Sequence, residues 1–333
     1  MKLYIKLTFV SLVSLVSLIG FLWYLESESK LKEIVANTYR PMFTTIFELS
    51  SDLDQNEIYT RGKNLNLIDI ALLDNPLISR IYTIDKLLEI YSSTIVDSLS
   101  DSEVGILVDN YKSLAEKEIV GAMKKCKFSE HKKSCLVNSI LNHAKSFSKY
   151  CNDNRELPKC SIDNLKRSSH IMSKVTSLNQ SMIDRSANYL TSEINEYFRN
   201  SPIIGEADKY CRKYFDSNIR FLAMAYCKNG FELGSVKSGL VLAALYRQSV
   251  MKSDIDKSKN LYNKLVINDT TGEAYYMLGI MQMNKSKGAK NRIIGLCNLK
   301  SAAQLKYKKA IEELEFLMIK RPSYTKINCE TES

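Results

Sequence analysis

Histidine, glycine and proline are scarce in this 333-residue chain, and each scarcity excludes something. Three histidines leave few groups that change charge near neutral pH or ligate a metal, which argues against a histidine-based centre. Glycine and proline number 12 and 5, too few for the many turns of a β-protein, so long helices are expected. A Ser-His-Asp order, an HExxH motif, a phosphate-binding glycine loop and a paired-carboxylate motif are lacking too, so we expect neither an enzyme nor a cofactor.

What the chain does contain is ordinary for a globular protein. Apolar residues make up 45% and charged residues 25%, and the length fits one large or two medium domains. Lys and Arg number 47 against 37 Asp and Glu, a net charge of +10. Nucleic acid is nevertheless not the expected partner, because no reading motif occurs and the export argued next would separate the two.

The segment from Leu7 to Leu25 is uncharged over 19 residues, long enough for a helix to span a bilayer. Two lysines precede it and two glutamates follow it, which favours residues 1–6 in the cytoplasm and export of the remainder. Cleavage as a signal peptide near Ser27 and Ser29 is the alternative, but the apolar stretch exceeds that of usual signals. We therefore expect a single-pass bacterial inner-membrane protein with its C-terminal domain in the periplasm.

Residues 26–200 show helical periodicity and predict an exported all-α bundle, with apolar residues recurring every three or four positions from Ile78 to Ile95. Polar breaks fall at 74–76, 98–102, 126–135, 152–158 and 200–202. The last break is the predicted domain boundary. It leaves residues 201–321 as a second helical domain and residues 322–333 as a tail.

The eight cysteines are interpreted as disulfides because exported thiols oxidise. In the bundle, Cys126 with Cys135 and Cys151 with Cys160 each bracket a predicted turn, which favours two local disulfides. A helical hairpin that pairs Cys126 with Cys160 and Cys135 with Cys151 is the alternative.

The segment around the first cysteine loop is rich in lysine and holds two of the histidines. It would suit an anionic surface such as phospholipid, cell-wall polymer or an acidic protein, although a solvated turn is the simpler interpretation. The lysines concerned are Lys124, Lys125, Lys127, Lys132 and Lys133. A zinc site from Cys126, His131, Cys135 and His143 would have a spacing that matches no common structural site, so we expect no metal.

From about residue 202 the sequence repeats with a period of 36, with two amphipathic segments in each period. Such a pattern predicts stacked helical hairpins, because a single hairpin cannot bury its apolar face. Small residues at Ala207, Ala243 and Gly279 are expected where the helices of a hairpin approach most closely. The repeated positions are Ser238, Leu242, Ala243 and Tyr246, then Ala274, Leu278, Gly279 and Gln282, then Ala310 and Leu314, with Ala207 and Tyr210 one period before Ala243 and Tyr246.

These residues resemble the Sel1-like repeats, a branch of the tetratricopeptide-type solenoids, over about residues 202–320. The first-helix motif of that family, Ala-x3-Leu-Gly/Ala-x2-Tyr, matches the positions just given, although Gln282 replaces one Tyr and Glu315 replaces the last small residue. The second-helix motif matches Lys257, Ser258, Leu261, Tyr262, Lys264, Leu265 and Val266, then Cys297, Asn298, Lys300, Ser301 and Ala302. The resemblance implies an α-solenoid whose first helices contact a protein or peptide, with Leu240, Val241, Tyr275 and Met277 as candidate contacts.

The remaining cysteines fit the same hairpins. Cys211 and Cys227 flank a turn near residues 216–218, so a disulfide would join the two helices of the first hairpin. Cys297 lies on a later second helix and Cys329 in the tail, where a disulfide would staple the tail to the last hairpin. Free buried thiols are the alternative for both pairs.

Together these features predict an N-terminal transmembrane helix, a helical bundle and a short α-solenoid. The expected function is that of a membrane-anchored periplasmic adaptor or scaffold for a protein or peptide partner. An extracytoplasmic sensor, whose bundle binds a small ligand and acts through a membrane partner, is the alternative.

Overall fold

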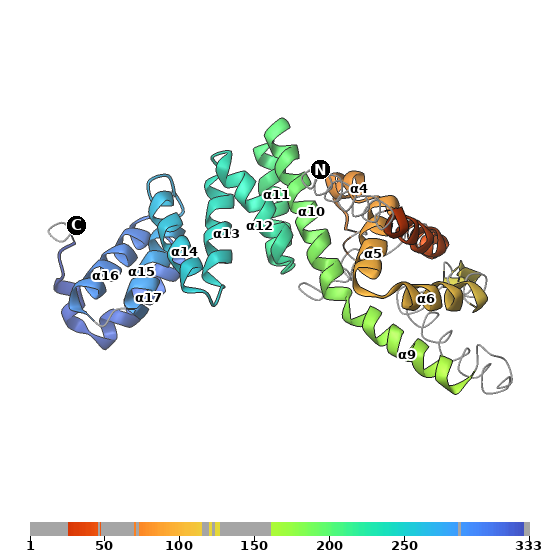
Figure 1. Ribbon diagram of the computed structural model, residues 1–333. Helices are drawn as coiled ribbons and strands as arrows, with labels where there is room; N and C mark the ends of the chain where they lie inside the picture. The colour runs from red at the N-terminus through yellow and green to blue at the C-terminus, as the bar shows by residue number, and fades with distance from the viewer. Residues whose placement is uncertain are drawn as a thin grey trace, which may run out of the picture. The chain divides into compact units, whose positions relative to one another are not determined.

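The computed structural model describes residues 26–45, 47, 70, 73–114, 120–121, 124–126, 161–285 and 288–329. These residues are helical throughout apart from turns, and no strand occurs among them, as the glycine and proline counts predict. The chain divides into two compact units, and the division falls inside α10 (Asn179–Asn200), between Leu190 and Thr191. Figure 1 shows the helices of both units in chain order.

The first unit contains the helix of residues 26–45, α4 (Pro76–Ile81), α5 (Ile84–Ser98), α6 (Asp101–Leu114), α9 (Ile162–Ser177) and the start of α10. The predicted break at 74–76 starts α4, because the Asn75 side chain accepts hydrogen bonds from the N–H groups of Leu77 and Ile78. A break that the periodicity missed follows Ile81. There Thr83 caps a new helix by accepting from the Lys86 N–H, so the apolar series runs across two helices.

Aromatic and polar contacts tie the helices of the first unit together. The ring of Tyr91 on α5 lies 5.0 Å from that of Tyr39 and 5.3 Å from that of Phe43, both on the helix of residues 26–45. The buried Tyr82 hydroxyl lies 2.6 Å from the Ser186 hydroxyl on α10. Buried hydroxyl groups are nearly always hydrogen-bonded, and this bond holds α10 against the start of α5.

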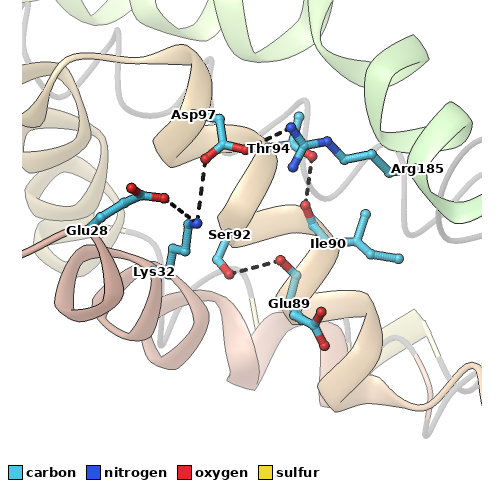
Figure 2. A network of polar contacts seen from close by, with 8 residues as sticks. All are labelled: Glu28, Lys32, Glu89, Ile90, Ser92, Thr94, Asp97 and Arg185. Atoms are coloured by element: carbon cyan, nitrogen blue, oxygen red, sulfur yellow. Dashed lines mark hydrogen bonds and ion pairs between the residues drawn. The ribbon is translucent and has the colours of Figure 1, made fainter. Parts of the chain in front are cut away.

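Asp97, at the end of α5, joins three helices through its carboxylate (Figure 2). Lys32 lies 3.6 Å away on the helix of residues 26–45 and also pairs with Glu28. Arg185 reaches the other carboxylate oxygen of Asp97 from α10, at 2.8 Å. The side chains are about one third exposed, so water weakens the pairs and their main effect is to orient the helices.

The second unit is an array of helical hairpins. Each helix from α11 onward packs against the next one along the chain, and α11 also packs against α13. The turn predicted near residues 216–218 separates α11 from α12, with Asn218 at a positive φ of 58°. The helices are α11 (Ile204–Asp216), α12 (Arg220–Glu232), α13 (Val236–Arg247), α14 (Lys252–Leu265), α15 (Glu273–Lys285), α16 (Ala289–Gln304), α17 (Lys308–Lys320) and the 3₁₀ helix η4 (Pro322–Lys326).

The helices of each hairpin cross at small or cross-linked residues. In the second hairpin the Ser258 hydroxyl donates to the carbonyl oxygen of Ala243 at 2.8 Å. In the third, a Cβ added to Gly279 would lie 2.9 Å from the carbonyl oxygen of Gly295. The first hairpin carries the predicted disulfide of Cys211 with Cys227 at this place, with a Cα–Cα distance of 4.7 Å.

The crossings correct the register of the first repeat. The 36-residue period holds from α13 to α17, where Ser238, Ala274 and Ala310 are each at most 1% exposed. In α11, however, the crossing residue that corresponds to Ala243 is Cys211, 32 positions earlier in the chain, and not Ala207. Ala207 is buried farther along the same hairpin, beside Gly230 of α12.

The tail turns back onto the last helices. The predicted disulfide of Cys297 with Cys329 joins it to α16, and the Lys300 side chain donates to the carbonyl oxygen of Ile327 at 2.7 Å. Tyr324 and Ile327 thereby pack on the buried cluster of Leu296, Leu299 and Leu314. The apolar seam between α16 and α17 is covered by the tail.

Several predicted features fall on residues that the structure does not describe. Cys126 is buried and disulfide-bonded, and Lys124 and Lys125 are exposed. Among the residues with assigned positions, no helix is both long and apolar enough to cross a membrane. The residues that lie outside are the segment Leu7 to Leu25, Lys127, His131, Lys132, Lys133, Cys135, His143, Cys151 and Cys160.

Candidate binding surface

An aromatic and acidic surface forms where the start of α15 meets the turn between α16 and α17. Gly272 precedes α15 with a positive φ of 80°, and a Cβ there would lie 2.9 Å from the carbonyl oxygen of Ala302 and 3.2 Å from the Cβ of Tyr307. Only glycine combines this φ with so close a contact. The turn therefore packs against the start of α15 and places Tyr307 beside Glu273.

Asp269 fixes the loop that leads into α15. Its buried carboxylate accepts hydrogen bonds from the Thr271 N–H at 2.9 Å, the Thr271 hydroxyl, and the Ala274 N–H at 2.7 Å. These bonds satisfy N–H groups that a helix start leaves unpaired. They also keep a negative charge close to Glu273, the first residue of α15.

Tyr276 and Tyr307 supply the aromatic part of this surface. Their ring centroids lie 5.2 Å apart at an interplanar angle of 44°. Both side chains are half-buried, and Tyr276 rests on the cluster of Leu296, Leu299 and Leu314. Partial burial raises the pKa of both hydroxyls, and neighbouring carboxylates contribute, Glu313 at Tyr276 and Glu273 at Tyr307.

Glu273 is a half-buried carboxylate that forms no ion pair with a described residue. Burial raises its pKa, and the negative charge of Asp269 raises it further. Arg212, Lys309 and Arg247 act in the opposite direction from a distance, but within the described parts none of them forms an ion pair with Glu273. The Glu273 charge is therefore less well compensated than that of a usual surface glutamate.

Tyr262 of α14 has a buried hydroxyl that makes no hydrogen bond of normal length and angle within the described residues, and the Arg247 side chain acts on it as a weak donor. The residue is 0% exposed, and burial raises its pKa above the ordinary value, with Glu273 and Tyr307 acting in the same direction and Arg247 against it. A buried hydroxyl without a partner costs about 1 to 3 kcal/mol. Because Tyr262 is not exposed, its hydroxyl cannot contact a partner side chain directly, and it is linked to Glu273 and Tyr307 only through electrostatic interaction.

We name Glu273, Tyr276, Tyr307 and Glu313 the aromatic-acidic surface. Aromatic faces attract cations, and carboxylates pair with them. A lysine or arginine side chain offers a cation on an apolar stem that such rings can cover. The chemistry of this surface therefore favours a basic side chain, and no group of acidic, histidine or cysteine residues able to hold a metal occurs in the described ranges.

Three of the four contacts implied by the solenoid resemblance are buried. Leu240 is 6% exposed, and Val241 and Met277 are 9% exposed, because they face neighbouring helices. Only Tyr275 of the four is half-exposed. The sequence interpretation missed its neighbour Tyr276 and missed Tyr307, which lies in the turn before α17.

Comparisons of the chain with protein-family models, with curated proteins and with solved structures found no match. The surface is therefore interpreted from its own chemistry.

Proposed function

We propose that this protein is a membrane-anchored adaptor that binds a protein or peptide partner through its hairpin array. In this proposal the aromatic-acidic surface receives a lysine or arginine side chain of the partner. The observation that carries the proposal is the incompletely compensated carboxylate of Glu273 beside the paired rings of Tyr276 and Tyr307. A half-buried charge of this kind costs stability in the unbound protein, and a bound cation with its hydrogen-bond donors would relieve that cost.

The architecture supports a binding role. Two disulfides fasten the array, one inside the first hairpin and one between the tail and α16, so the surface is presented on a constrained framework. A preorganised surface loses less conformational entropy on binding. An extended array of hairpins offers a shallow and open face, which suits a protein segment better than a small molecule.

The anchor and location belong to the same proposal. The uncharged segment Leu7 to Leu25 would hold the protein in a bacterial inner membrane, with the array in the periplasm. The disulfides of the array are consistent with an oxidising compartment.

Site-specific crosslinking tests the proposal in the full-length protein in its membrane. A photoreactive phenylalanine analogue at position 276 is expected to join the chain to a partner segment that contains Lys or Arg. Glu273→Gln should reduce that product at least tenfold. The matched control is Glu232→Gln, an exposed carboxylate on α12, which should leave it unchanged. Absence of a crosslinked partner, or equal yield from the Glu273→Gln chain, would overturn the proposal.

A further inference from the structure

The outward face of α17 carries large apolar side chains. Ile319 is 80% exposed, Phe316 50% and Ile311 38%. The opposite side of the helix holds Ala310 and Leu314, which are buried against the array. The last helix of a solenoid normally has a polar outer face, because nothing stacks on it. The face of α17 departs from that rule.

Among the described residues, the tail does not cover this face. After α17 it enters η4 and then follows α16, to which Cys329 is joined by the disulfide with Cys297. Tyr324 and Ile327 pack on the seam between α16 and α17 instead. Phe316 and Ile319 are therefore open to contact with another surface.

The charged residues on either side of Phe316 indicate what kind of surface would be complementary to this face. Glu312, Phe316 and Lys320 recur every four residues and so share one side of α17. Glu312 is exposed and has one partner, Lys308, at 3.7 Å with 89% and 60% of the side chains exposed. The Lys320 ammonium lies 4.2 Å from the Phe316 ring centroid and is exposed as well. An acidic residue one turn before the ring and a basic residue one turn after it make this stripe self-complementary.

We propose that α17 docks against α17 of a second copy of this chain, antiparallel about a two-fold axis at Phe316. In that arrangement Glu312 of each copy lies opposite Lys320 of the other, and Phe316 stacks on its symmetry mate. A two-fold interface uses the same patch on both subunits, which is what this charge order provides. Ile319, one turn from Phe316, adds apolar contact on both sides.

The association is expected to be reversible, because one helix face buries little surface. Interfaces below about 1,200 Å² are characteristic of weak or transient complexes. The inference rests on exposed side chains of α17 and does not rest on the proposed function. An adaptor that pairs in this way would present two partner sites, so that a divalent partner gains avidity.

Charge exchange in the full-length protein, held in detergent micelles, tests the pairing. Sedimentation velocity over a concentration series should show a monomer–dimer equilibrium for the natural chain. Lys320→Glu places glutamates opposite each other and should weaken dimerisation at least tenfold, as should Phe316→Glu. The double variant Glu312→Lys/Lys320→Glu restores opposite charges and should recover dimerisation. The control Ile267→Glu, at an 83% exposed isoleucine outside α17, should dimerise like the natural chain.

The membrane segment is the same in every variant, so pairing through lipid-facing residues would not respond to these exchanges. A monomer at all concentrations, or a dimer indifferent to Phe316→Glu and to Lys320→Glu, would overturn the proposal. So would a photocrosslink from position 316 that joins α17 to a different protein rather than to α17 of a second copy.

Discussion

Gly279 and Gly295 face each other where α15 crosses α16, and neither position has room for a β-carbon. A Cβ on Gly279 would lie 2.8 Å from the Leu299 Cγ and 2.9 Å from the Gly295 carbonyl oxygen, and one on Gly295 would lie 3.0 Å from the Gly279 carbonyl oxygen. The two backbones therefore touch. This crossing supports α15, from which Glu273 and Tyr276 project.

Gly279→Trp should destabilise the array by more than about 2 kcal/mol, because a large side chain must separate the two backbones. Gly279→Ala should also destabilise, although alanine favours a helix by about 1 kcal/mol over glycine. Chemical denaturation of the full-length protein measures both. The control Gly205→Ala lies in α11 with nothing within 4 Å of the added atom, and it should be neutral or stabilising. Equal stability of all three variants would contradict the packing described here.

The 36-residue period correctly predicted α13, α15 and α17, the first helices of successive hairpins, because their small and apolar residues keep the same spacing. Ser238, Ala274 and Ala310 show it directly. It failed in the first repeat, where the shorter connection to α13 moves the crossing to Cys211. Loop length does not alter helix periodicity, so the sequence pattern alone could not reveal the shift. The pairing of Cys211 with Cys227 was predictable because a short turn brings the two helices of a hairpin back to the same height.

Two buried tyrosines should respond to loss of the hydroxyl in opposite directions. Tyr262→Phe removes a hydroxyl that makes no hydrogen bond of normal geometry and has only Arg247 as a weak donor, and it should leave stability unchanged or raise it by up to about 1 kcal/mol. Tyr82→Phe removes the hydroxyl that bonds Ser186 at 2.6 Å and should cost about 1 kcal/mol. Denaturation midpoints of the two single variants decide the matter, and a loss of stability in Tyr262→Phe would mean that its hydroxyl has a partner.

Acid should weaken the first unit through Glu103. Hydrogen bonds from Lys174 and from the Ser100 N–H lower the pKa of Glu103 from 4.5 to about 2. The folded protein thus binds this proton less tightly than the unfolded chain, so the stabilisation is present above pH 4.5 and is lost as the pH falls towards 2. Glu103→Gln should flatten the decline of stability across that window. Thermal melts between pH 2 and 6 measure this. The prediction is contradicted if the melting temperatures of the natural chain and of Glu103→Gln fall equally as the pH is lowered.

Removal of the Cys297 to Cys329 disulfide should release the tail. The bond closes a loop of 32 residues, which in the chain-entropy model is worth about 3 to 4 kcal/mol. In Cys297→Ser/Cys329→Ser, trypsin should cut rapidly after Lys326, at the end of η4, once Ile327 no longer packs on the cluster of Leu296, Leu299 and Leu314. The variant Cys211→Ser/Cys227→Ser keeps the tail disulfide and should resist cleavage there. Equal cleavage of the two variants would show that the tail is not held by this bond.

The aromatic-acidic surface was only partly within reach of the sequence. Tyr275 and Tyr276 are neighbours, and one position turns a helical side chain by about 100°. Which of the two tyrosines faces the surface therefore depends on the rotation of α15 about its own axis. That rotation is fixed by Gly272 and by the hydrogen bonds of Asp269 at the start of the helix. Tyr307 joins the surface only because the turn before α17 packs on Gly272, a contact between segments far apart in the chain.

Glu273 should link stability to binding. Burial and the charge of Asp269 raise its pKa, so the folded protein holds this proton more tightly than the unfolded chain does. Its contribution therefore becomes less favourable as the pH rises through 4.5. Glu273→Gln should raise the melting temperature at pH 7, with a smaller gain at pH 4, and should at the same time reduce crosslinking from position 276. A residue kept at a cost to stability is expected where binding requires it. A lower melting temperature at pH 7 would show that Glu273 is already compensated in the free protein, and the reason for placing a cation there would be lost.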